Sequence, residues 1–587
     1  MRATAGPEVA APGTGPRHGP LRTWAVLAGV TGACSAVIVA WALAGTDGRL
    51  TYAIDDAGIH LSMAHHLVRD GTWGVSAGTF EPASSSPAWT LLLAAATWLA
   101  GGVAAWWPLL GNLAAAGWVC RLVARHQRVL HLGGRTWGAW AAALVLPWAA
   151  FHLPGLAVIG MEHTLQAALW LVALVHLDRC CGTDPDRAVP PGAGPSRDGW
   201  VVAGALAAAS PVRYETVFLT LGCVLALWAC GRSTPGTGTA RAGRAVWSVR
   251  WLAASAVPIV AMGVVNVAFG RSPFPNPILR KSGLGADRGL LPGPGALWER
   301  MSGDVLCSLV VIGATVWAWR AWRARRAEVP SGAYATALAA AGWGQLILAN
   351  VGWWSRYQAA VVIAGVLLAL RVLPAVVPGG LRQPALAGLA ALVVATSAVR
   401  VHQTRDAALA MRNTYRQQVQ VGRFLAEAYR GRAVGVTDLG YTSLQHDGPI
   451  VDLEGLGTRE VLRARRAGRF DRSFLERLLA ERDVELLAIY DLPYLRIFPR
   501  GWAAVGTWDH GLRNVTPLYR RVAFFAPEGA AADRADRALR AFARRLPPGV
   551  VFRDRERILT DHLAQLERRR ARASRTDRTG RTDRTVP

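Results

Sequence analysis

Charged side chains are scarce in this chain of 587 residues: they make up 18% of it, whereas 52% of the residues are hydrophobic. An average soluble protein carries about 25% charged residues, which cover its surface. The composition therefore excludes an ordinary soluble enzyme and indicates that much of the chain lies in a membrane.

Two kinds of polar residue are in especially short supply. Acidic residues number 39 against 65 basic ones, which gives a net charge of +26. Lysine is nearly absent, since Lys281 is the only one and every other basic residue is arginine. A charge of this size on one soluble face would indicate nucleic-acid binding. The arginines are instead spread along the chain, so we expect no nucleic-acid partner.

Cysteine is also rare, with seven residues and none beyond Cys307. Most of them lie in apolar runs, and the adjacent pair Cys180 and Cys181 lacks the spacing of a zinc site. The sequence thus predicts no disulfide framework, and we interpret the cysteines as thiols buried in the membrane.

Long apolar runs dominate the first 400 residues. The first run, from Trp24 to Gly45, is about 22 residues long and can span a bilayer. It is too long for the usual core of a signal peptide, so we expect a retained helix after a cytoplasmic segment, residues 1–22. Ten further crossings are expected at 106–124, 137–152, 164–177, 199–211, 214–231, 251–270, 303–319, 333–350, 357–373 and 384–399.

The apolar run at 87–102 decides the topology. If it lies flat on the membrane surface, eleven crossings place twenty arginines in the cytoplasm and nine basic residues in the outer loops before residue 400. That bias is the one expected for a plasma-membrane protein, and a full crossing at 87–102 would spoil it. The chain is therefore predicted to be a multi-pass protein with residues 23–400 in the membrane region and its C-terminal part outside.

Beyond residue 400 the composition changes. Helix-like segments at 407–430 and 456–482 alternate with short β-rich runs at 433–437, 449–453 and 484–490. We expect a small extracytoplasmic α/β domain over residues 401–562. The rest, residues 563–587, is an arginine-rich tail that we expect to be disordered and to contact anionic surfaces.

The first outer loop, residues 46–105, is long for a connection between two spans and carries the adjacent carboxylates Asp55 and Asp56. Such a pair beside lipid suits a general base or a metal ligand. The alternative is that Asp56 caps the helix that follows. His60, His65 and His66 lie on that helix, but further zinc ligands are lacking, so we interpret them as solvated histidines at the membrane interface.

Several short motifs follow one another along the chain. After the acidic pair and the amphipathic helix come Ser86-Pro87-Ala88-Trp89-Thr90-Leu91-Leu92, Gly160-Met161-Glu162, Pro211-Val212-Arg213-Tyr214-Glu215, Pro275-Asn276-Pro277 with Lys281, Ser355-Arg356-Tyr357, and Val436-Thr437-Asp438-Leu439-Gly440 with Val451-Asp452-Leu453-Glu454-Gly455-Leu456. In this order they resemble the GT-C superfamily of polyprenyl-phosphate-sugar-dependent glycosyltransferases, in particular its bacterial mannosyl- and arabinofuranosyltransferase-like branch. The chain departs from that pattern at Pro277, where the branch has threonine, and at Glu81, which is one position from its usual offset.

The resemblance implies a fold and an activity. The fold is an α-helical polytopic membrane protein of the GT-C type, with about eleven transmembrane helices and a small C-terminal extracytoplasmic α/β domain. The donor is a polyprenyl-phosphate sugar, with arabinofuranose or mannose leading. The acceptor is a hydroxyl of a cell-envelope glycan, lipid or protein, attacked with inversion. No cofactor is certain, and a divalent metal held by Asp55 and Asp56 stays open.

The same resemblance assigns roles to the polar residues, all of which fall on the outer side of the eleven-span topology. Asp55 or Asp56 is the base. Phosphate binding falls to Arg213, Lys281 and Arg356, while Glu162 and Glu215 orient substrates or basic groups. Asn276 and Tyr357 join the substrate site through their motifs.

Ionisable groups of both signs near one face of a bilayer are costly, and this independently indicates a site. Each residue also has a plainer interpretation: Lys281 is a chance survivor, Arg213 and Glu215 pair across a helix break, and Glu162 is an ordinary loop acid. A lipid-substrate transporter or flippase and a membrane-anchored scaffold with an outer binding domain are the alternative functions. The first predicts internal repeats and charges near mid-membrane, and the second gives no reason for the acidic pair.

Overall fold

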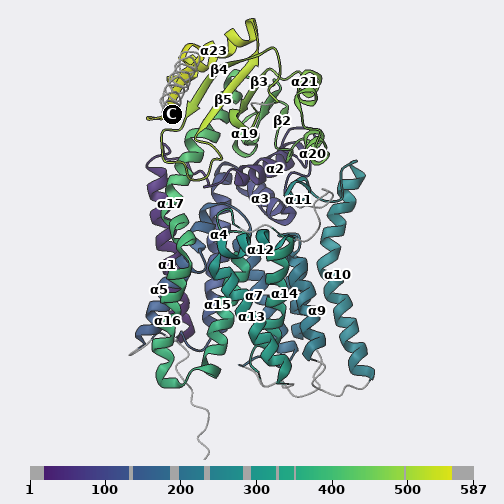
Figure 1. The fold of residues 1–587 in the computed structure, drawn as a ribbon, viewed down its shortest axis with the longest axis vertical. Helices are drawn as coiled ribbons and strands as arrows, with labels where there is room; N and C mark the ends of the chain where they lie inside the picture. The colour runs from purple at the N-terminus through teal and green to yellow at the C-terminus, as the bar shows by residue number, and fades with distance from the viewer. Residues whose placement is uncertain are drawn as a thin grey trace, which may run out of the picture.

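The computed structural model describes residues 19–130, 132, 136–185, 197–230, 238–281, 292–324, 329–349, 352–494 and 497–557. Its first part is a bundle of helices, and a domain with a six-stranded sheet covers one end of that bundle (Figure 1). We call this end the domain end. Residues 1–18 and 558–587, which include the predicted arginine-rich tail, lie outside the described residues.

A helix lies at each of the eleven apolar runs that the sequence predicts to cross the membrane. They are α1 (Gly19–Leu43), α4 (Trp107–Arg125), α5 (Trp137–Ala149), α7 (His163–Cys180), α8 (Arg197–Ala209), α9 (Thr216–Cys230), α10 (Gly238–Ala268), α13 (Val305–Arg323), α14 (Gly332–Leu348), α15 (Ala359–Val376) and α16 (Arg382–Thr396). Figure 1 shows the longest of them running side by side along the vertical axis.

Five stretches among the described residues are long and apolar enough to cross a membrane: α1, Trp137–Val158, α10, α13 and α15. A bent pair of helices, Gly379–Thr396 with Ala398–Ala428, brings the number to six if it counts as one span. The other expected spans are shorter or more polar, and helices such as α7 and α14 are mostly buried among their neighbours. The chain is thus a multi-pass membrane protein.

The run at 87–102 forms helix α3 (Pro87–Ala100), which lies across the domain end of the bundle (Figure 1). Its Trp98 and Leu99 are 75% and 74% exposed. Tryptophan, like Trp98, is enriched where membrane and water meet. This position agrees with the prediction of a helix lying along the surface.

Short elements fill the space between the bundle and the C-terminal domain. They are α2 (Asp56–Asp70), the 3₁₀ turn η1 (Gly101–Trp106), α6 (Leu153–Val158), α11 (Asn276–Lys281) and α12 (Pro294–Gly303). Another short turn, η2 (Gly379–Leu381), joins α15 to α16. Helix α2 packs against α3 on one side and against α19 (Gly440–Gln445) of the C-terminal domain on the other. The first loop therefore forms part of the junction between the two regions.

The chain enters the C-terminal domain through one long helical connection, made of α17 (Ala398–Thr414), a π-helical turn (Tyr415–Val419) and α18 (Gln420–Ala428). Phe424 on α18 belongs to the core of this domain, where its ring centroid lies 5.5–5.6 Å from those of Trp508, Phe524 and Phe542. The connection thus ends inside the domain that it carries.

The sheet has the strand order β2-β1-β3-β5-β4-β6. The strands are β1 (Val434–Val436), β2 (Ile450–Asp452), β3 (Leu486–Ile489), β4 (Trp502–Asp509), β5 (Arg521–Pro527) and β6 (Val551–Asp554). The first three pair in parallel, and the last three are antiparallel. The remaining helices of the domain are α20 (Arg459–Arg466), α21 (Arg472–Glu481), α22 (Asp491–Tyr494) and α23 (Ala530–Ala543).

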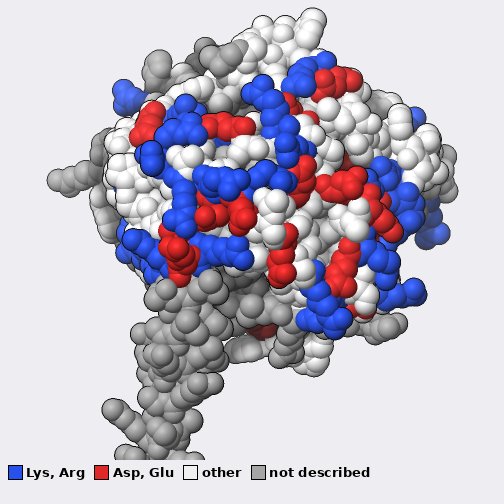
Figure 2. Space-filling view, turned by 90° about the horizontal axis from the view of Figure 1, so that it is seen from above, with Lys and Arg blue, Asp and Glu red and all other residues white. Residues whose placement is uncertain are grey.

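Viewed from above, the C-terminal domain mixes basic and acidic side chains over its face rather than gathering one sign (Figure 2). The domain contains ion pairs between arginine and carboxylate side chains, for example Arg540 with Asp536 and Asp554. The excess of arginine therefore does not form a single basic surface on this face.

All seven cysteines are free thiols.

Candidate active site

Four segments that are far apart in the sequence meet at the domain end of the bundle. They are the first loop, the turn before α7, the connection between α8 and α9, and the connection between α14 and α15. They bring together six of the side chains that the sequence assigns to a site: Asp56, Glu162, Arg213, Glu215, Arg356 and Tyr357. We call these six residues the polar network.

Arg213 holds one half of the network together. Its Nη1 donates to Glu162 Oε1 at 3.0 Å, while its Nη2 and Nε donate to the two carboxylate oxygens of Glu215 at 2.5 and 3.1 Å. Glu162 is fully buried and Arg213 is 6% exposed. Buried charges are tolerated only when they are paired and hydrogen-bonded. The predicted pairing of Arg213 with Glu215 is therefore present, and Glu162 is more than a loop acid.

The imidazole ring of His60 lies next to the carboxylate of Glu162. Its Nε2 lies 3.7 Å from Glu162 Oε2, and its Nδ1 lies 3.1 Å from Ser84 and 3.0 Å from Thr90. Burial lowers the pKa of His60, so the ring is neutral at neutral pH. The prediction of solvated histidines is wrong for His60 and also for His66, each 3% exposed, because α2 is covered on both sides.

Arg356 holds the other half of the network. Its Nη2 donates to Asp56 Oδ2 at 2.6 Å and to the hydroxyl of Tyr357 at 2.9 Å. The guanidinium carbons of Arg356 and Arg213 lie 4.9 and 5.3 Å from the centre of the Tyr357 ring. Tyr357 thus links the two arginines through its π face.

Two buried polar atoms of the network make no hydrogen bond in the described part of the chain: Arg356 Nε and Glu162 Oε2. Such atoms are rare in folded proteins and mark places where a ligand or water completes the bonding. The polar network therefore keeps two buried atoms that can still form hydrogen bonds.

The backbone that presents Arg356 is strained. Trp353, Trp354 and Ser355 all have positive φ angles of 43°, 68° and 50°, a region that side chains with a Cβ rarely adopt. Strain of this kind persists where the surrounding structure fixes it, which is often at functional sites.

Beside this segment, Gln358 donates to Asp304 at 2.6 Å, and Arg400 binds both oxygens of Asp304. These contacts tie the strained segment to α13 and α17. Sequence patterns gave no sign of the Asp304–Arg400 pair.

Asp55 does not share the surroundings of Asp56. Its Oδ2 and Oδ1 accept the backbone N–H groups of Gly440 and Tyr441 at 2.6 and 3.0 Å. The residue at the N-cap of α2 is Asp55 and not Asp56, and the Asp55 side chain makes no capping hydrogen bond to that helix. It binds the start of α19 in the C-terminal domain instead. A Cβ on Gly440 would lie 1.9 Å from the Asp55 carbonyl oxygen. Glycine is therefore required for this close approach.

Asp438 lies near Asp55 and was not assigned to the site from sequence. It accepts hydrogen bonds from the hydroxyl of Tyr490 and from Gln418 Nε2, the latter at 2.9 Å. Burial raises the pKa of Asp438, although these two bonds oppose the rise. Burial and the charge of Asp438 likewise raise the pKa of Asp55, against its two backbone bonds.

The junction between the two regions is expected to weaken as the pH rises. A carboxyl group with a raised pKa in the folded state keeps a proton that the unfolded chain releases. Its contribution to stability is complete below the ordinary pKa of about 4 and is lost as the pH rises through the raised value. We expect the Tm of the purified protein to fall between about pH 5 and about pH 8. Asp438→Asn should reduce this fall, whereas an unchanged pH dependence in that variant contradicts the assignment.

Asn276 makes its contacts outside the polar network. Its Nδ2 donates to Glu81 Oε1 at 2.5 Å and to the carbonyl of Leu456 at 2.9 Å. Glu81 also pairs with Arg271 at 3.1 Å. Lys281 is the last residue of α11, but its side chain lies outside the described part of the structure, so its predicted phosphate contact stays a prediction.

A metal ion bridging Asp55 and Asp56 does not fit the arrangement. Both oxygens of Asp55 accept backbone N–H groups, and Asp56 faces Arg356. Among the described residues, no group of three or more His, Cys, Asp or Glu side chains is arranged to hold a metal. We therefore derive no step through a metal.

Comparisons with known proteins cover the chain unevenly. A family model described as a domain of unknown function, DUF8728, matches residues 407–528, from α17 to just beyond β5. No curated protein shows significant similarity to the chain.

Two similar solved structures are both of ArnT from Cupriavidus metallidurans. The apo crystal structure is 15% identical with a TM-score of 0.45, over 85% of this chain and 98% of ArnT. The structure bound to undecaprenyl phosphate is 14% identical with a TM-score of 0.44, over 86% and 99% of the two chains.

Proposed function

We propose that the chain is a membrane glycosyltransferase of the GT-C type, which moves a sugar from a polyprenyl-phosphate donor to a hydroxyl of a cell-envelope acceptor. One observation carries the proposal: carboxylates and guanidinium groups from four separate segments meet at the end of a membrane bundle, with polar atoms left unsatisfied. The motif order that resembles this superfamily supports it. The arginine distribution supports a reaction on the extracytoplasmic face, with the N-terminus in the cytoplasm.

Asp56 is the base in this proposal. Its side chain is 28% exposed, whereas both oxygens of Asp55 are engaged by backbone groups. Asp56 takes the proton of the acceptor hydroxyl as that oxygen forms a bond to the anomeric carbon. The bond from this carbon to the phosphate oxygen breaks, its electron pair stays on the phosphate, and the configuration inverts. The products are the glycosylated acceptor and polyprenyl phosphate.

Arg356 and Lys281 stabilise the leaving phosphate in this mechanism. Arg356 keeps a buried Nε without a hydrogen-bond partner in the described chain, and positive charge there stabilises the developing negative charge. Arg213 directs its N–H groups at Glu162, Glu215 and Ser85. We therefore assign Arg213 a positioning role instead of the predicted phosphate contact. Tyr357 then links the two arginines.

The identity of the sugar rests on the motif resemblance alone, which favours arabinofuranose or mannose. The test is transfer by the purified protein in detergent, given radiolabelled polyprenyl-phosphate sugars and extracted wall glycans, lipids and proteins as acceptors. We expect label to move from the arabinofuranosyl or the mannosyl donor. Absence of transfer from every donor, with a protein that unfolds cooperatively, would overturn the proposal.

A further inference from the structure

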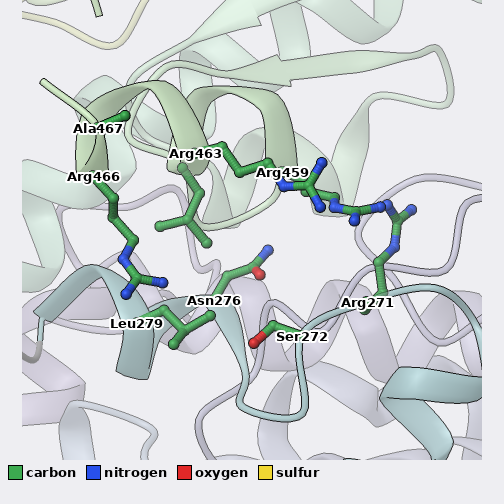
Figure 3. A pocket seen from close by; sticks show the side chains of 9 residues that line it. Arg271, Ser272, Asn276, Leu279, Arg459, Arg463, Arg466 and Ala467 are labelled. Carbon is green, nitrogen blue, oxygen red and sulfur yellow. The ribbon is translucent and has the colours of Figure 1, made fainter. Parts of the chain in front are cut away.

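A cavity of about 410 Å³ opens between the bundle and the C-terminal domain, outside the polar network. Its lining residues come from the segment after α10, from α11 and from α20. Four of them are arginines, Arg271, Arg459, Arg463 and Arg466, and none is acidic. Figure 3 shows Arg459 and Arg463 above Arg271 at one end of the cavity, and Arg466 above Leu279 at the other.

The arginines of α20 face the cavity because of their spacing. Arg459, Arg463 and Arg466 follow one another at four and three residues, which places them on one face of a helix. Within the described residues, the side chains of Arg459 and Arg463 make no hydrogen bond or ion pair. The neighbouring Arg465, in contrast, binds Glu454 and Tyr494. Like charges at this spacing on a helix repel one another, and Glu81, whose charge acts on Arg459, already pairs with Arg271.

The floor of the cavity belongs to the membrane region and is held by several contacts. Arg271 donates to the carbonyl of Phe80 at 2.9 and 2.7 Å and pairs with Glu81 at 3.1 Å. Phe80 stacks on Phe269 with ring centroids 4.2 Å apart. The first loop and the end of α10 are thereby fixed to each other directly beside the cavity.

Helix α10 exposes apolar side chains along the stretch that leads to this floor. Val260 and Val264 are 59% and 63% exposed, and Phe269, directly after the helix, is 60% exposed. Such exposure of apolar side chains is expected for a segment that contacts lipid tails. Arg271 follows Phe269 by two residues, so the cavity begins where this lipid-facing surface ends. A ligand with an apolar tail along α10 would carry its head group into the arginines.

We propose that this cavity binds the phosphate head group of a membrane lipid in the leaflet next to the C-terminal domain. Guanidinium groups suit phosphate because they present several donors in a fixed fork. The apolar lining from Leu279, Leu462 and Ala467 accommodates the first carbons of the tail. The cavity shares none of the six residues of the polar network, although Asn276 lines it and α11 ends at Lys281, the residue assigned above to the leaving phosphate. The proposal concerns lipid binding and is tested by binding, without sugar transfer.

The test measures lipid binding by the full-length protein in a neutral detergent. The protein is titrated with farnesyl phosphate, short-chain phosphatidylglycerol, short-chain phosphatidylcholine and inorganic phosphate. These ligands distinguish the contribution of the negative charge to the affinity from that of the apolar tail. We expect the two anionic lipids to bind at least about tenfold more tightly than phosphatidylcholine or inorganic phosphate. Tighter binding of farnesyl phosphate than of phosphatidylglycerol assigns the cavity to a lipid carrier, and the reverse assigns it to bulk lipid.

The variant Arg459→Gln/Arg463→Gln is expected to weaken binding of the anionic lipids by at least about tenfold, because it removes two charge-assisted contacts. Arg459→Lys/Arg463→Lys should keep part of the affinity. The matched control Arg477→Gln/Arg537→Gln removes the same charge from exposed positions of the same domain and should change nothing. Equal affinity in the first variant and the wild type, or inorganic phosphate that binds as tightly as the lipids, overturns the proposal.

Discussion

Asp56→Asn is expected to lower the rate of sugar transfer by about 10²- to 10⁴-fold, the usual contribution of a positioned general base. Asparagine keeps the size of the side chain and one oxygen that can accept from Arg356, so the fold should survive. Initial rates of transfer from the radiolabelled donor that the wild-type protein uses check the loss of activity. Thermal unfolding of the same variant checks that the fold survives.

Asp55→Asn is the matched control for this result, since it alters the neighbouring carboxylate in the same loop. It weakens the contacts to Gly440 and Tyr441, so we expect a lower Tm and a rate that stays well above that of Asp56→Asn. A strong loss of rate in Asp55→Asn with activity retained in Asp56→Asn would contradict the choice of base.

Arg213→Gln is expected to destabilise the protein by about 3–5 kcal/mol, as when one partner of a buried ion pair is removed. The variant leaves Glu162, which is fully buried, without its guanidinium partner. It should also lose most of its transfer activity, because Arg213 positions both Glu162 and Glu215. Thermal unfolding in detergent and the transfer assay measure the two effects.

A second substitution separates the charge effect from lost packing. Adding Glu162→Gln to Arg213→Gln removes the unpaired buried carboxylate, so the double variant should recover part of the lost Tm without recovering activity. A Tm equal to that of the wild type in Arg213→Gln alone would show that the pair with Glu162 does not stabilise the fold.

The membrane region could be predicted closely from sequence because a bilayer demands long apolar segments. All eleven predicted runs coincide with helices, and the run at 87–102 lies across the domain end as α3. In the C-terminal domain the three apolar runs before residue 491 were found as β1, β2 and β3. Strands β4, β5 and β6 were missed, since alanine, glycine and arginine within them blur the alternation that marks a strand.

All six residues of the polar network were assigned to a site from the sequence, because the order of the motifs and their common side of the predicted topology grouped them. Sequence could not separate Asp55 from Asp56. The difference between them arises from Gly440, which lies 385 residues away along the chain. Asp438 was missed as a site residue for the same reason.

Two further site predictions concern Lys281 and Asn276. The side chain of Lys281 lies outside the described part of the structure, so its phosphate contact stays a prediction. Asn276 was placed in the substrate site by its motif, and its side chain donates to Glu81 and to the carbonyl of Leu456 at the junction with the C-terminal domain. Local patterns do not report which distant backbone a side chain will meet.

A single-turnover reaction tests the central claim most directly. The wild-type protein, in excess over the donor that it uses, should yield glycosylated acceptor and polyprenyl phosphate in equal amounts, with the anomeric configuration of the transferred sugar inverted. Retained configuration, or polyprenyl phosphate released without sugar on the acceptor, would contradict one-step displacement at the Asp56 site.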